Sequence, residues 1–533
     1  GNLVTMKWWN NLWLNESFAN LMEYLGPDAL HPEWQIWNDF NSHEAVAALR
    51  RDAIDGVQSV QVDVNHPDEI STLFDPAIVY AKGGRLMRML QRYLGDEDFQ
   101  KGLRAYFTTH AYGNTEESDL WRALSDTSGK DITSFMSAWI TQPGYPVVHA
   151  NTSGLSQEQF FVGPHQNSVR IWPIPLGANS PDLPELFTSR TLEVPLKPGI
   201  HLNTQSSAHF ITHYSPELLE PLIAQVRNGE MDETGRFQLL HEQTLLARAG
   251  VVSSATLIPL LDAYSNETVE SVWESIALTI GELKKFVETD KESEAALKVL
   301  AGKIAKHQFE RLGWTQAENE TETDTKLRAT IVSLMMYSED PEVLAQAKDL
   351  YDSTESIESL DSELRSLILG TVVRHFPSKD IVEKLLSIHD NTTSAEIKID
   401  ICSALTSTKD GVTINTLLKR LKGPVRSQDV ARWFAYLIRN RDGRNISWQW
   451  MKDNWSWIEK TYAGDKSFDD FPHYAASSFS TNEYLKEYSE FFKPLESIPA
   501  LTRVIAMGKS EIEGRIELLE RDGDAVRKSL REL

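Results

Sequence analysis

The stretch from residue 216 to residue 533 is the feature that most limits what this chain can fold into. Apolar residues recur there at helical spacing in segments of about 10 to 20 residues, with short polar turns between them, and no segment alternates like a strand. Helices that follow one another over such a length commonly stack in pairs. No repeated motif in the sequence fixes a period. The order of elements therefore predicts an α-solenoid domain over residues 216–533.

Two different patterns precede this helical stretch. Residues 1–145 have helical apolar spacing, with helix stops expected at Gly26-Pro27 and Gly95. Residues 146–215 are punctuated by Pro and Gly and predict a small antiparallel β-sandwich. Its strand-like runs are Val147-Val148, Phe160-Phe161-Val162, Val169-Arg170-Ile171-Trp172 and Thr191-Leu192-Glu193-Val194. The expected fold class is mainly α with a small β-sandwich, in three domains that cover residues 1–145, 146–215 and 216–533.

The composition limits which kinds of partner and which cellular compartment we expect for the chain. The formal net charge is −24 and no basic cluster suits a phosphate backbone, which excludes nucleic acid as the main partner. The single cysteine, Cys402, rules out an intramolecular disulfide and predicts a reducing, cytoplasmic location. No apolar run approaches the roughly 20 residues that cross a bilayer, so no membrane partner is expected. The chain opens at Gly1 rather than Met, and we expect its natural start to lie upstream.

Glu16 stands out in a segment that is rich in tryptophan. The apolar face of the helix predicted there consists of Leu14, Phe18, Leu21, Met22 and Leu25. Glu16 lies on the opposite side, which by periodicity alone makes it a solvated surface acid. Trp8, Trp9 and Trp13 crowd the same stretch, however, and an acid among apolar side chains requires a partner such as a metal or a base. The residues alone leave both interpretations open.

Tyr80 lies in a second unusual segment. Asp75 is expected to cap a helix that begins with Pro76 and ends at Gly95. Two adjacent glycines, Gly83-Gly84, interrupt this helix at a cost of about 1 kcal/mol each relative to alanine. They indicate either that another backbone or a substrate approaches the turn after Tyr80, or that two helices pack tightly there. In the second case Tyr80 is an ordinary interface aromatic.

A set of short motifs resembles a known family. In chain order they are Trp13-Leu14-Asn15-Glu16, Phe18-Ala19, Phe74-Asp75, Tyr80-Ala81-Lys82-Gly83 and Gln142-Pro143-Gly144-Tyr145-Pro146-Val147. Together they resemble family M1, the gluzincin zinc aminopeptidases, over residues 1 to about 148. The likeness is strongest to the lactic-acid-bacterial branch of the family, through Lys7-Trp8-Trp9-Asn10 and Ile78-Val79. Beyond residue 148 the domain order fits, but no single motif discriminates.

The resemblance implies a zinc site. In this family two His ligands and a Glu base lie in an H-E-x-x-H helix, and a Glu further along the chain is the third ligand. Glu16 corresponds to that third metal ligand, and the H-E-x-x-H motif is expected just upstream of Gly1. Tyr80 corresponds to the catalytic tyrosine whose hydroxyl steadies the oxyanion. Residues 1–145 then form the carboxy-terminal part of a thermolysin-like catalytic domain, and the solenoid is of the HEAT-like kind.

The implied function is removal of amino-terminal residues from peptides, with Zn²⁺ as cofactor and peptides as substrates. Nothing within the chain replaces the H-E-x-x-H motif. His43-Glu44 and His241-Glu242 each lack the second His, and His209 and His213 have no third partner. We therefore expect residues 1–533 alone to bind no catalytic zinc and to be inactive.

A second interpretation belongs to another class of protein. In this alternative the chain is a noncatalytic helical-repeat scaffold that binds peptides or proteins, and residues 1–145 are the remnant of an enzyme. The occurrence of Glu16 and Tyr80 together, each in its family context, favours the enzyme. Two departures from the family, Ser17 in place of Gly and Gly84 in place of Ala, affect neither role. An intact H-E-x-x-H upstream separates the two interpretations.

Overall fold

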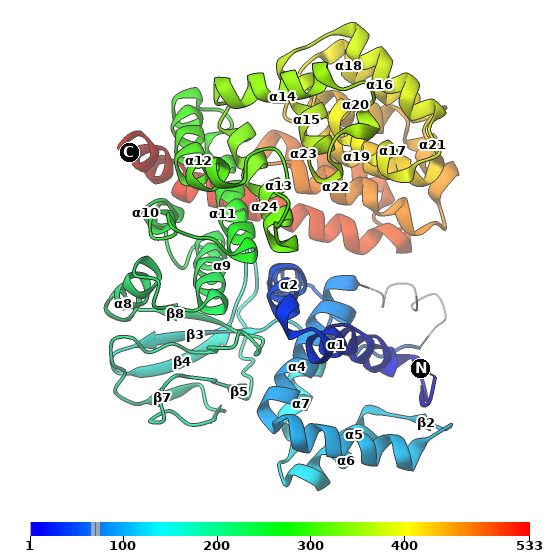
Figure 1. The fold of residues 1–533 in the computed structure, drawn as a ribbon. Coiled ribbons are helices and arrows are strands. Elements are labelled where there is room, and N and C mark those ends of the chain that lie inside the picture. Colours follow the sequence, from blue (N-terminus) through cyan, green and yellow to red (C-terminus); the bar gives the residue numbers. More distant parts are fainter. Residues whose placement is uncertain (1, 66–69, 71–74) are drawn as a thin grey trace. The chain divides into compact units, whose positions relative to one another are not determined.

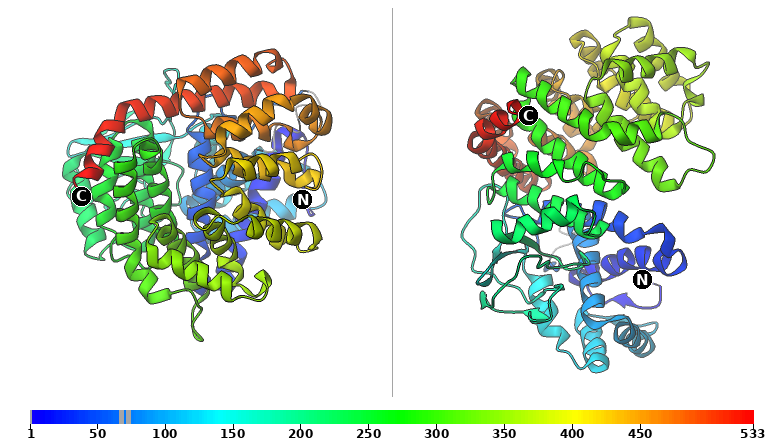
Figure 2. Two further views of the ribbon diagram at one scale, coloured as in Figure 1. Left: turned by 90° about the horizontal axis from the view of Figure 1, so that it is seen from above. Right: turned by 60° about the vertical axis from the view of Figure 1, so that its left-hand side comes forward.

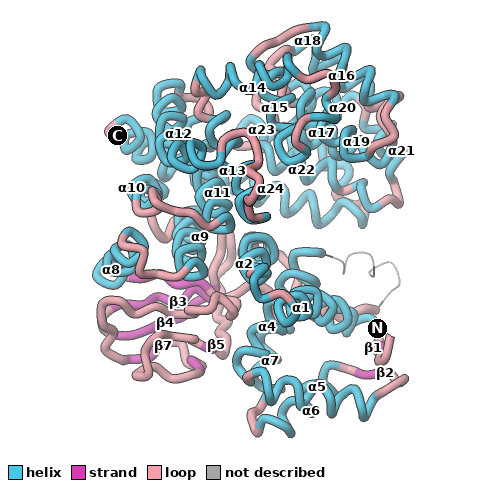
Figure 3. Tube along the Cα trace, viewed as in Figure 1, coloured by secondary structure: helices cyan, strands magenta, loops and turns pink. Residues whose placement is uncertain are grey.

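The computed structural model describes residues 2–65, 70 and 75–533. The chain divides into two compact units, unit 1 (Gly1–Thr279) and unit 2 (Ile280–Leu533). Helices make up most of both units, and the strands of unit 1 form small sheets (Figures 1 and 3). The expectation of a mainly α fold is confirmed.

Helices dominate the first half of unit 1. The elements are β1 (Thr5–Met6), α1 (Leu12–Leu30), α2 (Ile36–Asp39), the π-helical segment η3 (Phe40–Ala45), α3 (Val46–Asp52), the π-helical segment η5 (Pro76–Lys82), α4 (Gly83–Leu94), α5 (Asp96–His110), β2 (Asn114–Thr115), α6 (Glu117–Ser128) and α7 (Ile132–Thr141). Helix α1 packs against η5 and α4, so the two segments that carry Glu16 and Tyr80 are neighbours.

The two expected helix stops differ in outcome. Helix α4 ends at Leu94, and Gly95 follows with φ 82°, in the left-handed region that glycine adopts without strain, which confirms that stop. The stop at Gly26-Pro27 is wrong, because α1 continues to Leu30. Proline removes one amide donor from the helix, yet the last turn still closes where the His31 amide donates to the Pro27 carbonyl at 2.7 Å.

A four-stranded mixed sheet follows in unit 1, with the order β7-β4-β3-β8 (Figure 1). Strand β3 (Pro146–Asn151) pairs antiparallel with β4 (Gly154–Gln159), and β4 pairs antiparallel with β7 (Thr191–Glu193). Strand β8 (Ile211–Tyr214) pairs parallel with β3, so the expectation of a wholly antiparallel set is wrong. A separate two-stranded sheet joins β5 (Ile174–Pro175) to β6 (Leu186–Phe187). Packing of these sheets into a sandwich stays a prediction.

Two of the four strand-like runs are not strands. Residues 160–162 follow β4, and residues 169–172 precede β5. Phe160 and Trp172 are buried all the same, and the Trp172 amide donates to Oε1 of the buried Gln157 at 2.9 Å instead of to a neighbouring strand. A short apolar run therefore marked burial in the core rather than a place in the sheet.

Four helices complete unit 1 and lead out of it. They are α8 (Pro216–Arg227), α9 (Glu233–Ala249), α10 (Leu257–Asp262) and α11 (Glu270–Val287), and the boundary between the units falls within α11. One buried cluster joins the helical part of unit 1 to the sheet, and it consists of Leu49, Ala53, Tyr145, Val147, Phe160, Ile211, Leu245 and Leu246. Burial of these side chains fixes α3, the start of β3, β8 and α9 against one another.

Unit 2 is built from helices alone among the residues that the structure describes. They are α12 (Lys291–Leu312), α13 (Glu322–Tyr337), α14 (Pro341–Ser353), α15 (Ser362–His375), α16 (Lys379–Asn391), α17 (Ala395–Thr406), α18 (Gly411–Arg420), α19 (Ser427–Arg439), α20 (Arg444–Asp453), α21 (Trp455–Tyr462), α22 (Asp470–Ser478), α23 (Asn482–Phe492) and α24 (Pro499–Arg531). The helical character of residues 216–533 is confirmed, although α24, at 33 residues, is longer than expected. A HEAT-like repeat stays a prediction.

The ends of unit 2 contact each other. Helix α24 packs against α12 (Figure 2), and Arg531 pairs with Asp290. In the middle of the unit, Arg444 binds the Glu288 carboxylate with both terminal guanidinium nitrogens at 2.8 and 3.0 Å. These pairs join residues that lie far apart in the chain, so the array of helices curls back on its own start. Within the described ranges, every helix falls short of the length or apolar character needed to cross a membrane.

Candidate active site

The structure brings Glu16 and Tyr80 together. Glu16 lies early in α1 and is half-buried, and its Oε1 accepts a hydrogen bond from Asn15 Nδ2 at 3.2 Å. Tyr80 lies near the end of η5 and is also half-buried. Burial, the nearby Glu16 charge and a hydrogen bond between the two side chains all raise the pKa of the Tyr80 phenol. A neutral phenol donor therefore faces a carboxylate.

The two segments that carry these residues are in direct contact. Ser17 Oγ, one residue after Glu16, donates to the Val79 carbonyl at 2.7 Å. A Cβ built on Gly83 lies 1.8 Å from Ser17 Oγ, and one built on Gly84 lies 2.0 Å from Asn20 Oδ1. The adjacent glycines therefore make room for side chains of α1. This geometry supports tight packing of α1 against the glycine pair. Approach of a substrate to the turn after Tyr80 stays a prediction.

The buried face of α1 differs from the expected one. Its buried residues are Trp13, Leu14, Ser17, Asn20 and Leu21. Phe18, Met22 and Leu25 of the expected apolar face are only half-buried. Hydrophobic periodicity identifies only apolar side chains as buried. Burial of Ser17 and Asn20, which are polar and face a glycine pair, was therefore missed. The departures from the family pattern, Ser17 and Gly84, are both in this contact.

Tyr80 lies in a π-helical turn rather than in a regular α-helix. Asp75 caps the segment as expected and accepts from the Ala77 amide at 3.1 Å, while Arg51 Nε lies 2.9 Å from the other Asp75 oxygen. From Pro76 to Lys82 the helix is π-helical, and it becomes α-helical at Gly83. Single π-turns inside helices occur often at functional sites. The sequence predicted the helix but gave no sign of the π-turn, and Phe74 of the family motif lies outside the described residues.

A charged cluster beneath Tyr80 was not predicted. Lys82 Nζ lies 2.9 Å from Asp52 Oδ2, and both side chains are fully buried. His209 Nε2 lies 3.0 Å from the same oxygen. Burial alone raises the pKa of Asp52, but Lys82 and His209 together hold it below its ordinary value. Burial lowers the pKa of His209 to about 4, so its imidazole is neutral at pH 7 and donates to the carboxylate.

The histidines with ligand-like spacing do not converge. His209 turns to Asp52, whereas His213 on β8 faces His149 on β3, with the two Nδ1 atoms 2.9 Å apart. Glu242 on α9 is buried and accepts from the Thr212 amide at 2.9 Å. Burial raises the pKa of the Glu242 carboxyl to about 8. In the part of the chain that the structure describes, no three His, Cys, Asp or Glu side chains are placed to share a metal.

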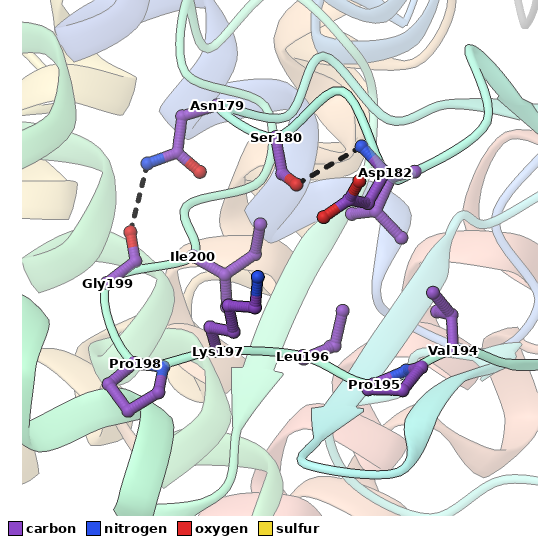
Figure 4. Close-up of a pocket in the computed structure, with 11 residues that line it drawn as sticks. Asn179, Ser180, Asp182, Val194, Pro195, Leu196, Lys197, Pro198, Gly199 and Ile200 are labelled. Atoms are coloured by element: carbon purple, nitrogen blue, oxygen red, sulfur yellow. Dashed lines mark hydrogen bonds between the residues drawn. The ribbon is translucent and has the colours of Figure 1, made fainter.

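A pocket of about 170 Å³ lies elsewhere in unit 1, between the loops of residues 179–183 and 194–200 (Figure 4). Asn179 Nδ2 donates to the Gly199 carbonyl at 2.9 Å, and the Asp182 amide donates to Ser180 Oγ at 3.3 Å. The first of these bonds joins the two loops, and the second lies within the loop of residues 179–183. Neither Glu16 nor Tyr80 lines this pocket, so the candidate site is the pair itself.

Comparison with known proteins assigns most of the chain. The peptidase family M1 domain matches residues 1–139, and the ERAP1-like C-terminal domain matches residues 200–514. Aminopeptidase N of Lactococcus lactis subsp. lactis (strain IL1403) is 41% identical over 549 residues, which cover 100% of this chain and 65% of that protein. Aminopeptidase N of Lactobacillus helveticus is 38% identical, with 99% and 64% covered, and aminopeptidase M1-D of Oryza sativa subsp. japonica is 30% identical, with 92% and 59% covered.

The chain thus spans about two thirds or less of the length of these relatives. The peptidase domain match contains both Glu16 and Tyr80, and the ERAP1-like match covers more than half of the chain. Motifs, fold class and whole-chain similarity agree, and this chain therefore belongs to peptidase family M1.

Proposed function

We propose that the protein containing this chain is a zinc aminopeptidase that removes amino-terminal residues from peptides. Glu16 acts as a metal ligand, and Tyr80 acts as the donor to the oxyanion of the reaction. The observation that carries the proposal is the pairing of the Tyr80 phenol with the Glu16 carboxylate across the contact of η5 and α1. The relatives named aminopeptidase N and aminopeptidase M1-D support the same reaction class.

Glu16 fits one position of a zinc site. Its carboxylate is half-buried, and among the described residues no Lys, Arg or His forms an ion pair with it. A carboxylate in such a place favours a cation, and zinc accepts oxygen ligands together with His nitrogens. The sequence of residues 1–533 contains no H-E-x-x-H motif, so in this proposal the two His ligands and the Glu base come from another part of the protein.

Tyr80 has the properties that the chemistry requires. Zinc in such a site supplies Lewis acidity toward the carbonyl that is attacked. The Tyr80 hydroxyl donates a hydrogen bond to the carbonyl oxygen as negative charge develops there, and it does so without a formal charge of its own. The Ser17–Val79 hydrogen bond and the glycine contacts fix η5 against α1, so the hydroxyl is in place before substrate arrives.

The test compares two proteins, residues 1–533 and the protein extended upstream through the metal motif. We expect one zinc per molecule and hydrolysis of alanyl or lysyl p-nitroanilide in the extended protein only, and Glu16→Ala to remove the zinc from it. The control is Glu358→Ala, which replaces an exposed acid. An extended protein with neither zinc nor activity would instead support the noncatalytic scaffold.

The compartment belongs to the same proposal. We infer that the protein works in the cytosol, because the chain has a single cysteine, Cys402, and that thiol is buried in α17. Such a chain gains nothing from an oxidising environment. The measurement is the activity of cytosolic and surface fractions of cells, and activity confined to the surface fraction would overturn the inference.

A further inference from the structure

Lys82, two residues after Tyr80, has an environment that the proposed reaction does not explain. Its side chain is fully buried, and lysine is among the residues least often found in such a place. Residues two apart on a helix do not share a face. Tyr80 therefore faces Glu16 on one side of η5, while Lys82 enters the interior of unit 1.

Segments far apart in the sequence meet at the Lys82 ammonium. Asp52, the last residue of α3, lies 2.9 Å from Nζ. The Gly144 carbonyl accepts at 3.1 Å, and the Gln142 carbonyl is at 3.5 Å. Both carbonyls belong to the Gln142-Pro143-Gly144-Tyr145 motif that precedes β3. The ammonium thus has three acceptors, which match its three N–H donors.

Asp52 is equally well satisfied. Its Oδ2 faces both Lys82 Nζ and His209 Nε2, and its Oδ1 accepts from the Gly144 amide at 2.9 Å. Lys82, Asp52, His209 and Gly144 are called the Lys82 cluster below. Residues 142–144 hold Lys82, and Gly144 and His209 hold Asp52, so contacts from separate segments fix the position of Nζ.

Net stability does not require such a cluster. A buried ion pair loses so much hydration that apolar side chains of similar volume often give an equally stable protein. The attested advantage of a buried ion pair is that it selects one arrangement of the chain. The arrangement at stake here is the π-turn, which lies between a capped start at Asp75 and the α-helix from Gly83.

We propose that Lys82 and Asp52 are positioning residues for Tyr80: the Lys82 cluster fixes the rotation of the π-turn η5 and so places the Tyr80 hydroxyl against Glu16. The structural part of this inference concerns residues 1–533 alone, and its catalytic consequence rests on the proposed function. The Ser17–Val79 hydrogen bond holds η5 from the α1 side, and the Lys82 cluster holds it from the core. Loss of the cluster leaves η5 with the Arg51–Asp75 contact at its start and the Ser17–Val79 hydrogen bond, and removes the contacts that hold its end at Lys82 from the core.

The first experiment uses residues 1–533 labelled with 3-fluorotyrosine. The ¹⁹F resonance of residue 80 is identified by its absence in Tyr80→Phe. The test variant is Lys82→Met with Asp52→Asn, which removes both charges, nearly preserves volume and leaves no unpaired buried charge. The control is Arg365→Met with Asp400→Asn, which removes a buried pair at 2.9 Å in unit 2. We expect the residue 80 signal to shift and broaden in the test variant and to stay unchanged in the control.

A second variant keeps the inference testable if the first variant does not fold. Lys82→Gln with Asp52→Asn also removes both charges, and the Gln amide can still donate to the carbonyls that Lys82 contacts. We expect its residue 80 signal to shift in the same direction by a smaller amount. Either variant, if folded with the wild-type signal of residue 80, would show that the cluster stabilises the fold without positioning Tyr80, and the inference would be wrong.

The catalytic consequence is tested in the extended protein that carries the metal motif. We expect Lys82→Met with Asp52→Asn to lower kcat by up to about 100-fold and to change KM little, because a misplaced donor mainly weakens the transition state. In a Tyr80→Phe background the same pair should cost almost nothing more, since the hydroxyl is already gone. Additive losses would contradict the inference. An inactive wild-type extended protein would refute the proposed function, and the ¹⁹F result would still decide the positioning role.

Discussion

Among single residues, Tyr80 carries the clearest prediction about catalysis. Tyr80→Phe keeps the ring that packs in η5 and removes only the hydroxyl. In the extended protein we expect kcat to fall about 100- to 1000-fold with KM little changed, as for loss of one donor to an oxyanion. Steady-state hydrolysis of an aminoacyl p-nitroanilide checks this. Tyr112→Phe is the matched control, because Tyr112 is 89% exposed, and a similar loss in both variants would contradict the role.

Glu242 gives a prediction about pH. Its folded-state pKa is about 8 against an ordinary value of 4.5, so the folded chain keeps a proton that the unfolded chain releases. The stability that this group contributes is complete below pH 4.5 and is lost as the pH rises through 8. Glu242→Gln removes the titration and keeps a side-chain oxygen that can accept from the Thr212 amide.

We therefore expect the unfolding free energy of the wild type to fall relative to that of Glu242→Gln between pH 5 and pH 8, by roughly 1–4 kcal/mol. Urea unfolding at a series of pH values measures the difference. Glu230→Gln, which replaces an exposed acid, serves as the control. A constant difference between wild type and Glu242→Gln across this range would show that Glu242 ionises normally in the folded chain.

Residues of the candidate site were predictable to different degrees. Glu16 and Tyr80 were found because each lies in a short motif of fixed letters. Lys82 lay in the same motif, but its ion pair was missed, because charged side chains are expected at the surface and His209 is 157 residues from Asp52 in sequence. A partner so distant has no local signal in a single sequence.

At the scale of elements, the contact between α1 and α4 depends on Gly83. Alanine at this position gains helix propensity of about 1 kcal/mol, but its Cβ would lie 1.8 Å from Ser17 Oγ and would displace that hydroxyl from the Val79 carbonyl. We expect Gly83→Ala to destabilise residues 1–533 by about 1–3 kcal/mol, because overpacking outweighs propensity.

Ser17→Gly combined with Gly83→Ala is the matched relief variant. It removes the colliding side chain, and we expect it to recover most of the lost stability. Differential scanning calorimetry of both proteins measures the effect. Equal melting temperatures for wild type and Gly83→Ala would show that α1 and α4 can move apart without loss of stability.

Elements were predicted best where a cap or a left-handed residue defines them. Asp75 and Gly95 mark the limits of the helix that contains Tyr80, and both were expected. Pairing of strands was predicted less well, because the parallel partner of β3 lies more than 60 residues downstream. The sequence of one strand does not indicate which other strand pairs with it. Gly26-Pro27 was misjudged because a proline near the end of a helix removes only one hydrogen bond.

At the scale of the whole molecule, the curled array of unit 2 depends on contacts between distant helices. The Arg444–Glu288 pair is largely buried, with 16% and 28% of the side chains exposed. We expect Arg444→Met to lower the unfolding free energy of unit 2 by about 1–2 kcal/mol, as for loss of charged hydrogen bonds at a shielded site.

Hydrogen exchange of the segment that follows α11 measures this effect, because residues near Glu288 should lose protection first. Lys528→Met is the control, since the Lys528–Glu532 pair is exposed and separated by 3.8 Å. Equal protection in wild type and Arg444→Met would mean that the array stays curled without the pair. Such closure was beyond prediction, because amphipathic spacing shows that helices form and not which ones meet.

The π-turn at residues 76–82 has a consequence for insertions and deletions. A π-turn is what remains when one residue is added to an α-helix without disturbing its two ends. Removal of Ala77 would restore ordinary winding, and it would turn Tyr80 by about 100° relative to one end of the helix. The shortened chain would keep its helices and its core, and it would lose the alignment of phenol and carboxylate. A change of one residue in the length of this segment can therefore leave the fold intact while the chemistry is lost.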